Sequence, residues 1–258
     1  VNNLAPLKTR LFIKILSSFE ELAIYAVAIG FAGFAKIIQI VFSTVWAPMV
    51  FKWNSEGQEL KQIDVVVKYV VMLIVFGFCI VGLLSSFVKY LLPQQYFEVQ
   101  WLLVSCVGGP LLFSLSEATV IGIGISRRNG YALVAAAIAF SVNVVGNLLL
   151  IPKFGSAGAA VSTCISFWIF LFFRTEFSIA LWRPLPRVSI YGFSAVSVIG
   201  AVLHTLYGAM AFPYFIAFWL LLFISTLIFF RNEILDLFLF VKNIKTKFYL
   251  SNDIKLSI

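Results

Sequence analysis

An apolar run from Ala132 to Ile151, without one charged residue, constrains this chain more than any other feature. As a helix it is long enough to cross a hydrocarbon core of roughly 30 Å. Similar runs recur along the sequence, so that 62% of the residues are hydrophobic and only 12% are charged, against about 25% in soluble domains. The mean hydropathy is +1.02. A soluble domain of 258 residues cannot hide so much apolar surface, and we therefore predict an all-α integral membrane protein.

The apolar runs predict about seven transmembrane helices. We expect them at residues 22–47, 65–88, 101–125, 132–151, 157–181, 190–207 and 211–230. They form a transmembrane domain at 22–231, with an interfacial start at 1–21 and a basic tail at 232–258.

Proline and glycine mark the predicted ends and bends of these helices. Pro48 is expected to end the first, and Gly108, Gly109 and Pro110 to kink the third. A turn after Ile151 uses Pro152, which lacks an amide donor, and Gly155, which permits the backbone to reverse.

The predicted loops divide the basic residues unequally between the two sides of the membrane. One side collects Lys52, Lys61, Lys68, Arg127, Arg128, Arg174, Arg183, Arg187 and the tail from Arg231 onward. The other keeps Lys89 and Lys153, with Lys8, Arg10 and Lys14 at the start. Because cytoplasmic loops carry an excess of Lys and Arg, the first side, with the C-terminus, is predicted to be cytoplasmic.

Lys36 lies near the centre of the first predicted helix, where a lysine that faces lipid costs about 2.5–3.5 kcal/mol on insertion scales. At about 100° per residue, Tyr25, Ala32, Lys36, Gln39 and Ser43 share one face of this helix. Such a polar stripe belongs against protein or water. A structural alternative is that Lys36 pairs with Glu117 of the third helix or snorkels to the surface.

Three stretches together carry a family resemblance. The first is the helix, turn and helix start NLLLIPKFGSAGAAVST at residues 147–163; the others are 21–48, which ends in Trp-Ala-Pro, and LLPQQY at 91–96. In them the chain resembles the prokaryotic polysaccharide flippases, the Wzx-type exporters of the multidrug/oligosaccharidyl-lipid/polysaccharide superfamily. The resemblance implies the C-terminal lobe of a two-lobe transporter, whose N-terminal half is a partner, as the start at Val1 rather than Met also suggests.

The family exports undecaprenyl-pyrophosphate-linked oligosaccharides across the bacterial inner membrane, for O-antigen and other surface polysaccharides, by alternating access. The resemblance implies a cationic lumen, in which the Lys36 ammonium would offset part of the cost of desolvating the pyrophosphate. Glu117 is a candidate for proton or cation coupling, although a structural role is favoured.

Several other residues are candidates for contact with this lipid-linked substrate. The amides of Gln39, Asn143 and Asn147 could bind sugar hydroxyls, with helix–helix hydrogen bonding as the favoured alternative. Arg127 and Arg128 could load the anion at the cytoplasmic end or serve only as topology signals.

Two other classes compete with the flippase interpretation. A multidrug or cation antiporter, or a peptidoglycan-precursor flippase, shares the architecture. A drug-type exporter is expected to show intramembrane acids prominently, whereas here one acid, Glu117, is balanced by one base, Lys36. A membrane enzyme such as a polysaccharide polymerase or acyltransferase usually shows large outer loops or an Arg, His and Asp cluster. Here the predicted outer loops are short and His204 is the only histidine, so we expect no catalytic residue. No cluster of Cys, His and carboxylate has metal-ligand spacing, and the basic residues follow membrane orientation, so we expect no metal site, no cofactor and no nucleic-acid partner.

Overall fold

The computed structural model describes residues 4–56, 61–236 and 239, and its regular elements there are all helices. The predicted all-α class is therefore confirmed for this part of the chain. In chain order the elements are α1 (Leu4–Leu16), α2 (Phe19–Ser55), α3 (Lys61–Leu84), η1 (Ser85–Tyr90), η2 (Gln94–Tyr96), α4 (Val99–Thr119), α5 (Ile121–Ile125), α6 (Gly130–Leu181), η3 (Val188–Gly192) and α7 (Phe193–Phe229). The predicted tail lies largely outside the described residues.

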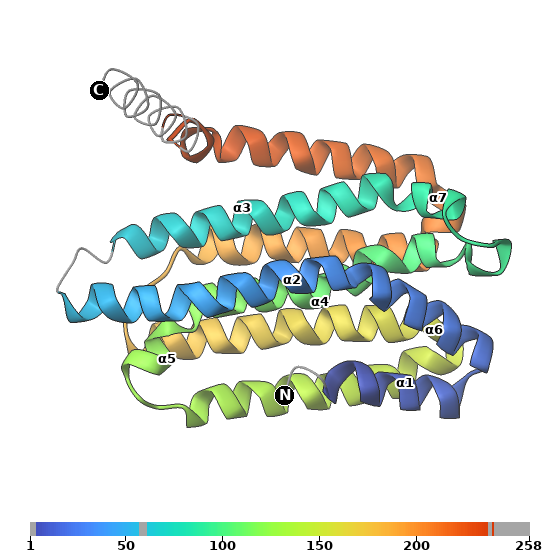
Figure 1. Ribbon diagram of the computed structural model, residues 1–258, viewed down its shortest axis with the longest axis horizontal. Coiled ribbons are helices and arrows are strands. Elements are labelled where there is room, and N and C mark those ends of the chain that lie inside the picture. Colours follow the sequence, from blue (N-terminus) through green and yellow to red (C-terminus); the bar gives the residue numbers. More distant parts are fainter. Residues whose placement is uncertain (1–3, 57–60, 237–238, 240–258) are drawn as a thin grey trace, which may run out of the picture.

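Five helices, α2, α3, α4, α6 and α7, are long and apolar enough to cross a membrane. They lie side by side along the long axis of the molecule (Figure 1). Apolar side chains such as Leu133, Ile199 and Ile228 remain exposed on their outer faces. Long parallel helices with apolar outer surfaces are what a multi-pass membrane protein requires.

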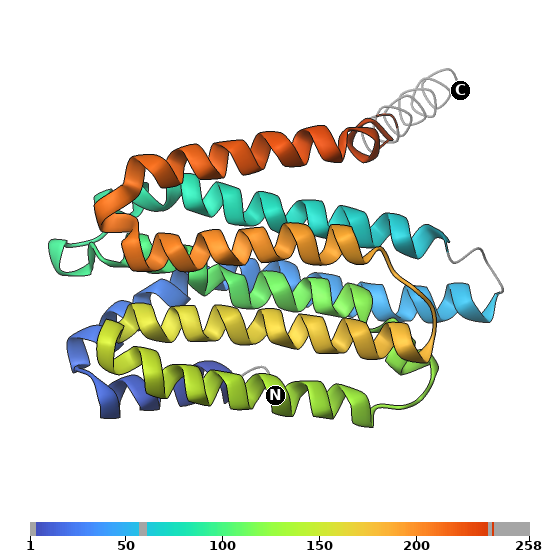
Figure 2. The same cartoon turned by 180° about the vertical axis from the view of Figure 1, so that it is seen from behind.

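Two of these five helices each consist of two helical segments. α6 leaves the helical conformation at Gly155, and α7 does so at Ala211, two residues before Pro213. Figure 1 and Figure 2 both show the chain reversing at these positions, so that the two segments of each helix run alongside one another. Gly155 has φ 52° and ψ −129°, a conformation that glycine tolerates best, as the turn predicted after Ile151 requires.

Helix α2 does not end at Pro48, so the predicted boundary was wrong. The helix continues to Ser55, and Pro48 lies inside it. Proline removes one hydrogen-bond donor from the helix. The turns on either side of it are nevertheless packed in the core, since Trp46 is 2% exposed and Val50 is fully buried. Tertiary packing on both sides thus holds the helix together across the proline.

Helix α4 forms the centre of the bundle and contacts α2, α3, α6 and α7. It runs from Val99 to Thr119, whereas one helix was predicted at 101–125, and Ile121–Ile125 form the separate short helix α5. The helix also runs on through the glycines expected to kink it. A Cβ on Gly108 would lie 2.5 Å from Cys164 Sγ, and one on Gly109 would lie 3.3 Å from the Phe167 ring. These glycines therefore permit the close approach of α6.

The links between helices gather at the two ends of the bundle. One end holds the C-terminal end of α2, the start of α3, the turn before α6 and the link from α6 to η3 (Figure 1). The other end holds the link from α1 to α2, the η1–η2 region and the turn at Gly155 (Figure 2). We call the second the Gly155 end. Arg127, Arg128, Arg183 and Arg187 belong to the links of the first end, whereas Lys89 and Lys153 belong to those of the Gly155 end.

Candidate binding cavity

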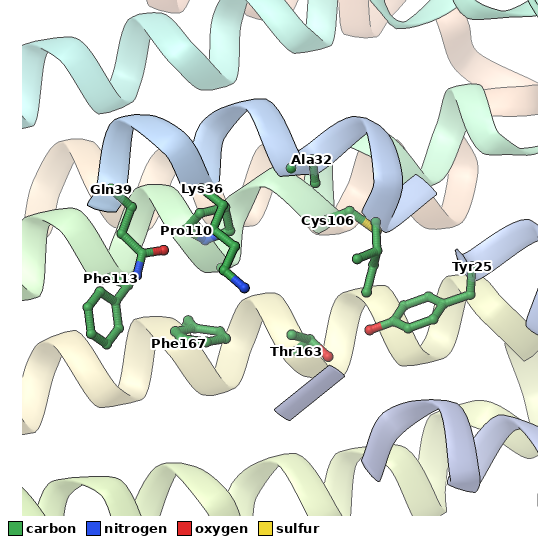
Figure 3. Close-up of a pocket in the computed structure, with 12 residues that line it drawn as sticks. Tyr25, Ala32, Lys36, Gln39, Cys106, Pro110, Phe113, Thr163 and Phe167 are labelled. Atoms are coloured by element: carbon green, nitrogen blue, oxygen red, sulfur yellow. The ribbon is translucent and has the colours of Figure 1, made fainter. Parts of the chain in front are cut away.

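A cavity of about 120 Å³ lies between α2, α4 and the second segment of α6, residues 156–181. Figure 3 shows the side chains from these three elements that surround it. The described residues that line it are Tyr25, Ile29, Ala32, Gly33, Lys36, Gln39, Cys106, Gly109, Pro110, Phe113, Thr163 and Phe167. Most of this lining is apolar or small, so the few polar groups decide which ligand the cavity would accept.

Lys36 and Gln39 supply the polar groups of α2, three residues apart on one face of the helix. The Lys36 side chain extends between α2 and α6 with its amine toward the cavity (Figure 3). It is half-buried, whereas Gln39 is buried with 6% of its surface exposed. Tyr25 and Ala32, which share the predicted polar face, line the same cavity. The polar stripe of the first predicted helix thus faces protein, as the sequence indicates.

Small and aromatic residues shape the remaining walls. Gly33 of α2 and Gly109 of α4 both line the cavity. Phe113 stands near Gln39, Phe167 lies between Phe113 and Thr163, and Tyr25 stands at the other end of the cavity with its hydroxyl toward Thr163 (Figure 3). The polar groups at the cavity are therefore the Lys36 amine, the Gln39 amide and the hydroxyls of Tyr25 and Thr163, in a lining that is otherwise mostly apolar.

Asn143 and Asn147 do not line this cavity, and the structure places them inside the α6 hairpin. Asn143 Nδ2 donates to Ser162 Oγ and Thr163 Oγ1 at 3.4 Å each, and Asn147 Nδ2 donates to Asn143 Oδ1 at 3.3 Å. Ser162 Oγ donates in return to the Asn143 carbonyl at 3.0 Å. Both asparagines are buried. They join the two segments of α6, which is the helix–helix role given as the favoured alternative.

Glu117 pairs with Arg174, a residue that the sequence analysis assigned only to the cytoplasmic side. Arg174 Nη1 donates to Glu117 Oε1 and to Ser116 Oγ, both at 2.8 Å. The guanidinium lies over Phe170 and Phe113, 4.8 and 5.6 Å from the ring centroids, and Arg174 is 9% exposed. The acid suggested as a structural partner of Lys36 thus neutralises a different base.

Arg174 is the partner of Glu117 that the sequence did not reveal. The residue lies seven positions before the end of α6, close enough to the predicted boundary to be counted with the loop charges. The available signal was Glu117 itself, because an acid inside an apolar helix calls for a basic partner on a neighbouring one.

Arg127 and Arg128 are exposed in the turn that follows α5, and neither lines the cavity. Arg127 adopts φ 55°, which is uncommon for a residue with a side chain. The structure therefore separates this basic pair from Lys36 and Gln39 and leaves it at the end of the bundle.

The remaining reactive side chains are packed in the bundle. His204 is fully buried between the two segments of α7, where its Nδ1 accepts a hydrogen bond from Trp219 Nε1 at 3.0 Å. Cys79, Cys106 and Cys164 are buried free thiols. Within residues 4–56, 61–236 and 239, no three His, Cys, Asp or Glu side chains are grouped so that they could hold a metal ion.

Comparisons of the chain with protein-family models, with curated proteins and with solved structures found no match.

Proposed function

We propose that this chain takes part in flipping undecaprenyl-pyrophosphate-linked oligosaccharides across the bacterial inner membrane, for the synthesis of O-antigen or another surface polysaccharide. The observation that carries the proposal is the Lys36 amine at an apolar cavity between long apolar helices. A polyanionic head group is costly to desolvate, and a fixed cation in a low-dielectric site offsets part of that cost. Gln39 would add an uncharged hydrogen-bonding group to the same wall.

The size of the cavity supports contact with a head group. At about 120 Å³ it is smaller than the roughly 300–1,000 Å³ of sites for drug-sized ligands. In the conformation described it has room for a phosphate-sized group but not for an oligosaccharide. The proposal therefore assigns the pyrophosphate to Lys36 and leaves the sugars to a wider, open conformation.

The transmembrane arrangement that goes with this function has seven crossings. We propose that α2, α3, α4 and both segments of α6 and α7 each cross the inner membrane, which places the C-terminus in the cytoplasm and the Gly155 end outside. The distribution of Arg and Lys between the two ends supports this orientation. The chain then forms one lobe, and the N-terminal half of the same transporter and membrane lipid are its partners.

Alternating access by such a lobe needs no catalytic nucleophile, metal or cofactor. A cation antiporter of the same architecture would depend on intramembrane acids, and the acid of α4, Glu117, is already engaged with Arg174. This pairing favours the flippase over the antiporter.

Direct binding of a prenyl pyrophosphate to the purified protein tests the proposal. Lys36→Ala should weaken the affinity for undecaprenyl pyrophosphate by about 10- to 100-fold, because a hydrogen bond to a charged group contributes about 1.5–3 kcal/mol. Undecaprenol, which lacks the phosphates, should bind equally to parent and variant. The measurement is a titration in nanodiscs followed by tryptophan fluorescence.

The matched control is Lys153→Ala, which removes the same charge from an exposed position in the turn before Gly155. It should bind the pyrophosphate as the parent does. Equal affinity of parent and Lys36→Ala for the pyrophosphate would exclude the cavity as the head-group site.

A further inference from the structure

One wall of the cavity, residues 156–181 of α6, is joined very differently to its neighbours at its two ends. Near its C-terminal end, three side-chain contacts connect it to α4 and α5: Arg174 with Glu117, Thr175 with Thr119, and Ser178 with Gly122. These contacts measure between 2.7 and 2.9 Å. This end of the wall is firmly anchored.

At the Gly155 end, a carboxylate of α2 makes the contact with this wall. Glu21 Oε2 accepts a hydrogen bond from the Ser156 backbone N–H at 2.6 Å. The bond is charge-assisted, and it supplies a negative group to the N-terminus of the segment that begins there. The contact is tight, because a Cβ on Gly155 would lie 2.6 Å from the Glu21 carboxyl. Removing the charge of one side chain would therefore weaken the attachment of this end.

Tyr25 lies four residues after Glu21, on the same face of α2. Its hydroxyl points toward Thr163, at the side of the cavity opposite Phe113 (Figure 3). Tyr25 is 1% exposed, so its ring fills the space between α2 and α6 there. The Tyr25 ring thus closes the cavity on the side away from Gln39, and the position of Thr163 against it depends on how α6 is held.

Gly155 provides the backbone freedom for this end of the wall to move. Its φ of 52° and ψ of −129° interrupt the helix directly before Ser156, so the helix before the turn is not continuous with the helix after it. A cavity of about 120 Å³ must widen before it can take a ligand larger than a phosphate-sized group. At this end residues 156–181 are tied to α2 by one charged hydrogen bond, at Glu21, and to residues 130–154 by the uncharged hydrogen bonds between Asn143, Ser162 and Thr163. The two segments of α6 therefore have to move together at the Gly155 end.

We propose that Glu21 is a latch that holds the cavity narrow. When its bond to Ser156 is released, the Gly155 end of the α6 hairpin swings away from α2 about the end anchored at Arg174, Thr175 and Ser178, Thr163 leaves Tyr25, and the cavity widens toward the Gly155 end. This inference rests on the proposed function in that both place the ligand in the same cavity.

Alkylation of Cys106 tests the latch without any substrate, because this thiol lines the cavity and is 9% exposed. With Cys79→Ala and Cys164→Ala in place, Cys106 is the single thiol, and a membrane-impermeant maleimide is added to vesicles of either orientation. Glu21→Gln should raise the labelling rate from the Gly155 side on the order of tenfold, with no change from the other side. The neighbouring Glu20→Gln, which removes an exposed carboxylate, should leave the rate unchanged.

A second variant breaks the same hydrogen bond from the other side, in case Glu21→Gln does not fold. Ser156→Pro removes the donor instead of the acceptor, and proline is well tolerated at the first position of a helix. It should raise labelling from the same side. Unchanged labelling in both variants, or an equal rise from both sides, would overturn the latch.

The labelling rate reports access to the Cys106 thiol and can be measured without any substrate, so it tests the latch independently of ligand binding. Faster labelling from the Gly155 side without any pyrophosphate binding would exclude the proposed function but support the latch. Pyrophosphate binding with unchanged labelling would support the proposed function but exclude the latch.

Discussion

Replacing Glu117 with alanine is expected to lower the free energy of unfolding by about 3–5 kcal/mol, because the variant leaves the Arg174 charge buried without its counter-ion. In the parent the two groups meet at 2.8 Å, with their side chains 11% and 20% exposed. The same guanidinium is enclosed by the Phe113 and Phe170 rings, which cannot replace a carboxylate. Unfolding of the purified protein by denaturant in detergent micelles measures the loss.

Two further variants separate this effect from the loss of any carboxylate. Glu56→Ala breaks an exposed pair with Lys52, at 3.8 Å, and should change the stability by less than about 1 kcal/mol. Adding Arg174→Met to Glu117→Ala removes the stranded charge and should restore much of the loss. A Glu117→Ala protein as stable as the parent would show that the pair is not structural.

Gly155→Ala is the second substitution with a large expected effect. At φ 52° and ψ −129° a side chain is strained by about 1–3 kcal/mol, and its Cβ would press on the Glu21 carboxyl 2.6 Å away. We expect a lower unfolding midpoint and, because Glu21 is displaced, faster labelling of Cys106 from the Gly155 side. Denaturant titration measures the first and maleimide labelling the second.

Gly130→Ala is the matched control, since a Cβ on Gly130 meets nothing within 4 Å and the residue lies at the start of α6. Its stability should equal or slightly exceed that of the parent. If Gly155→Ala were as stable as Gly130→Ala, the turn would not depend on the glycine conformation.

The sequence predicted those parts of the fold that depend on local chemistry. The turn after Ile151 was predictable because Gly155 accepts a positive φ at little cost. The face of α2 that carries Lys36 and Gln39 followed from helical periodicity alone, and the cavity lies along that face.

The features that the sequence could not predict depend on contacts between distant segments. Pro48 signals a helix end locally, but the packing of Trp46 and Val50 carries α2 past it. The partner of Glu117 required knowing which helix lies beside α4, and Arg174 is 57 positions away in the sequence. The bond from Ser156 to Glu21 spans 135 positions and has no local signature.

Surface glycan in a strain that lacks its own oligosaccharide flippase tests the central claim most directly. The complete gene is expressed with Lys36 intact or changed to alanine, with Lys153→Ala as the control, and the membrane level of each protein is measured alongside. We expect the parent and Lys153→Ala to restore surface glycan, whereas Lys36→Ala should reach the membrane at a normal level and fail to restore it. Full rescue by Lys36→Ala, or no rescue by an inserted parent, would contradict that claim.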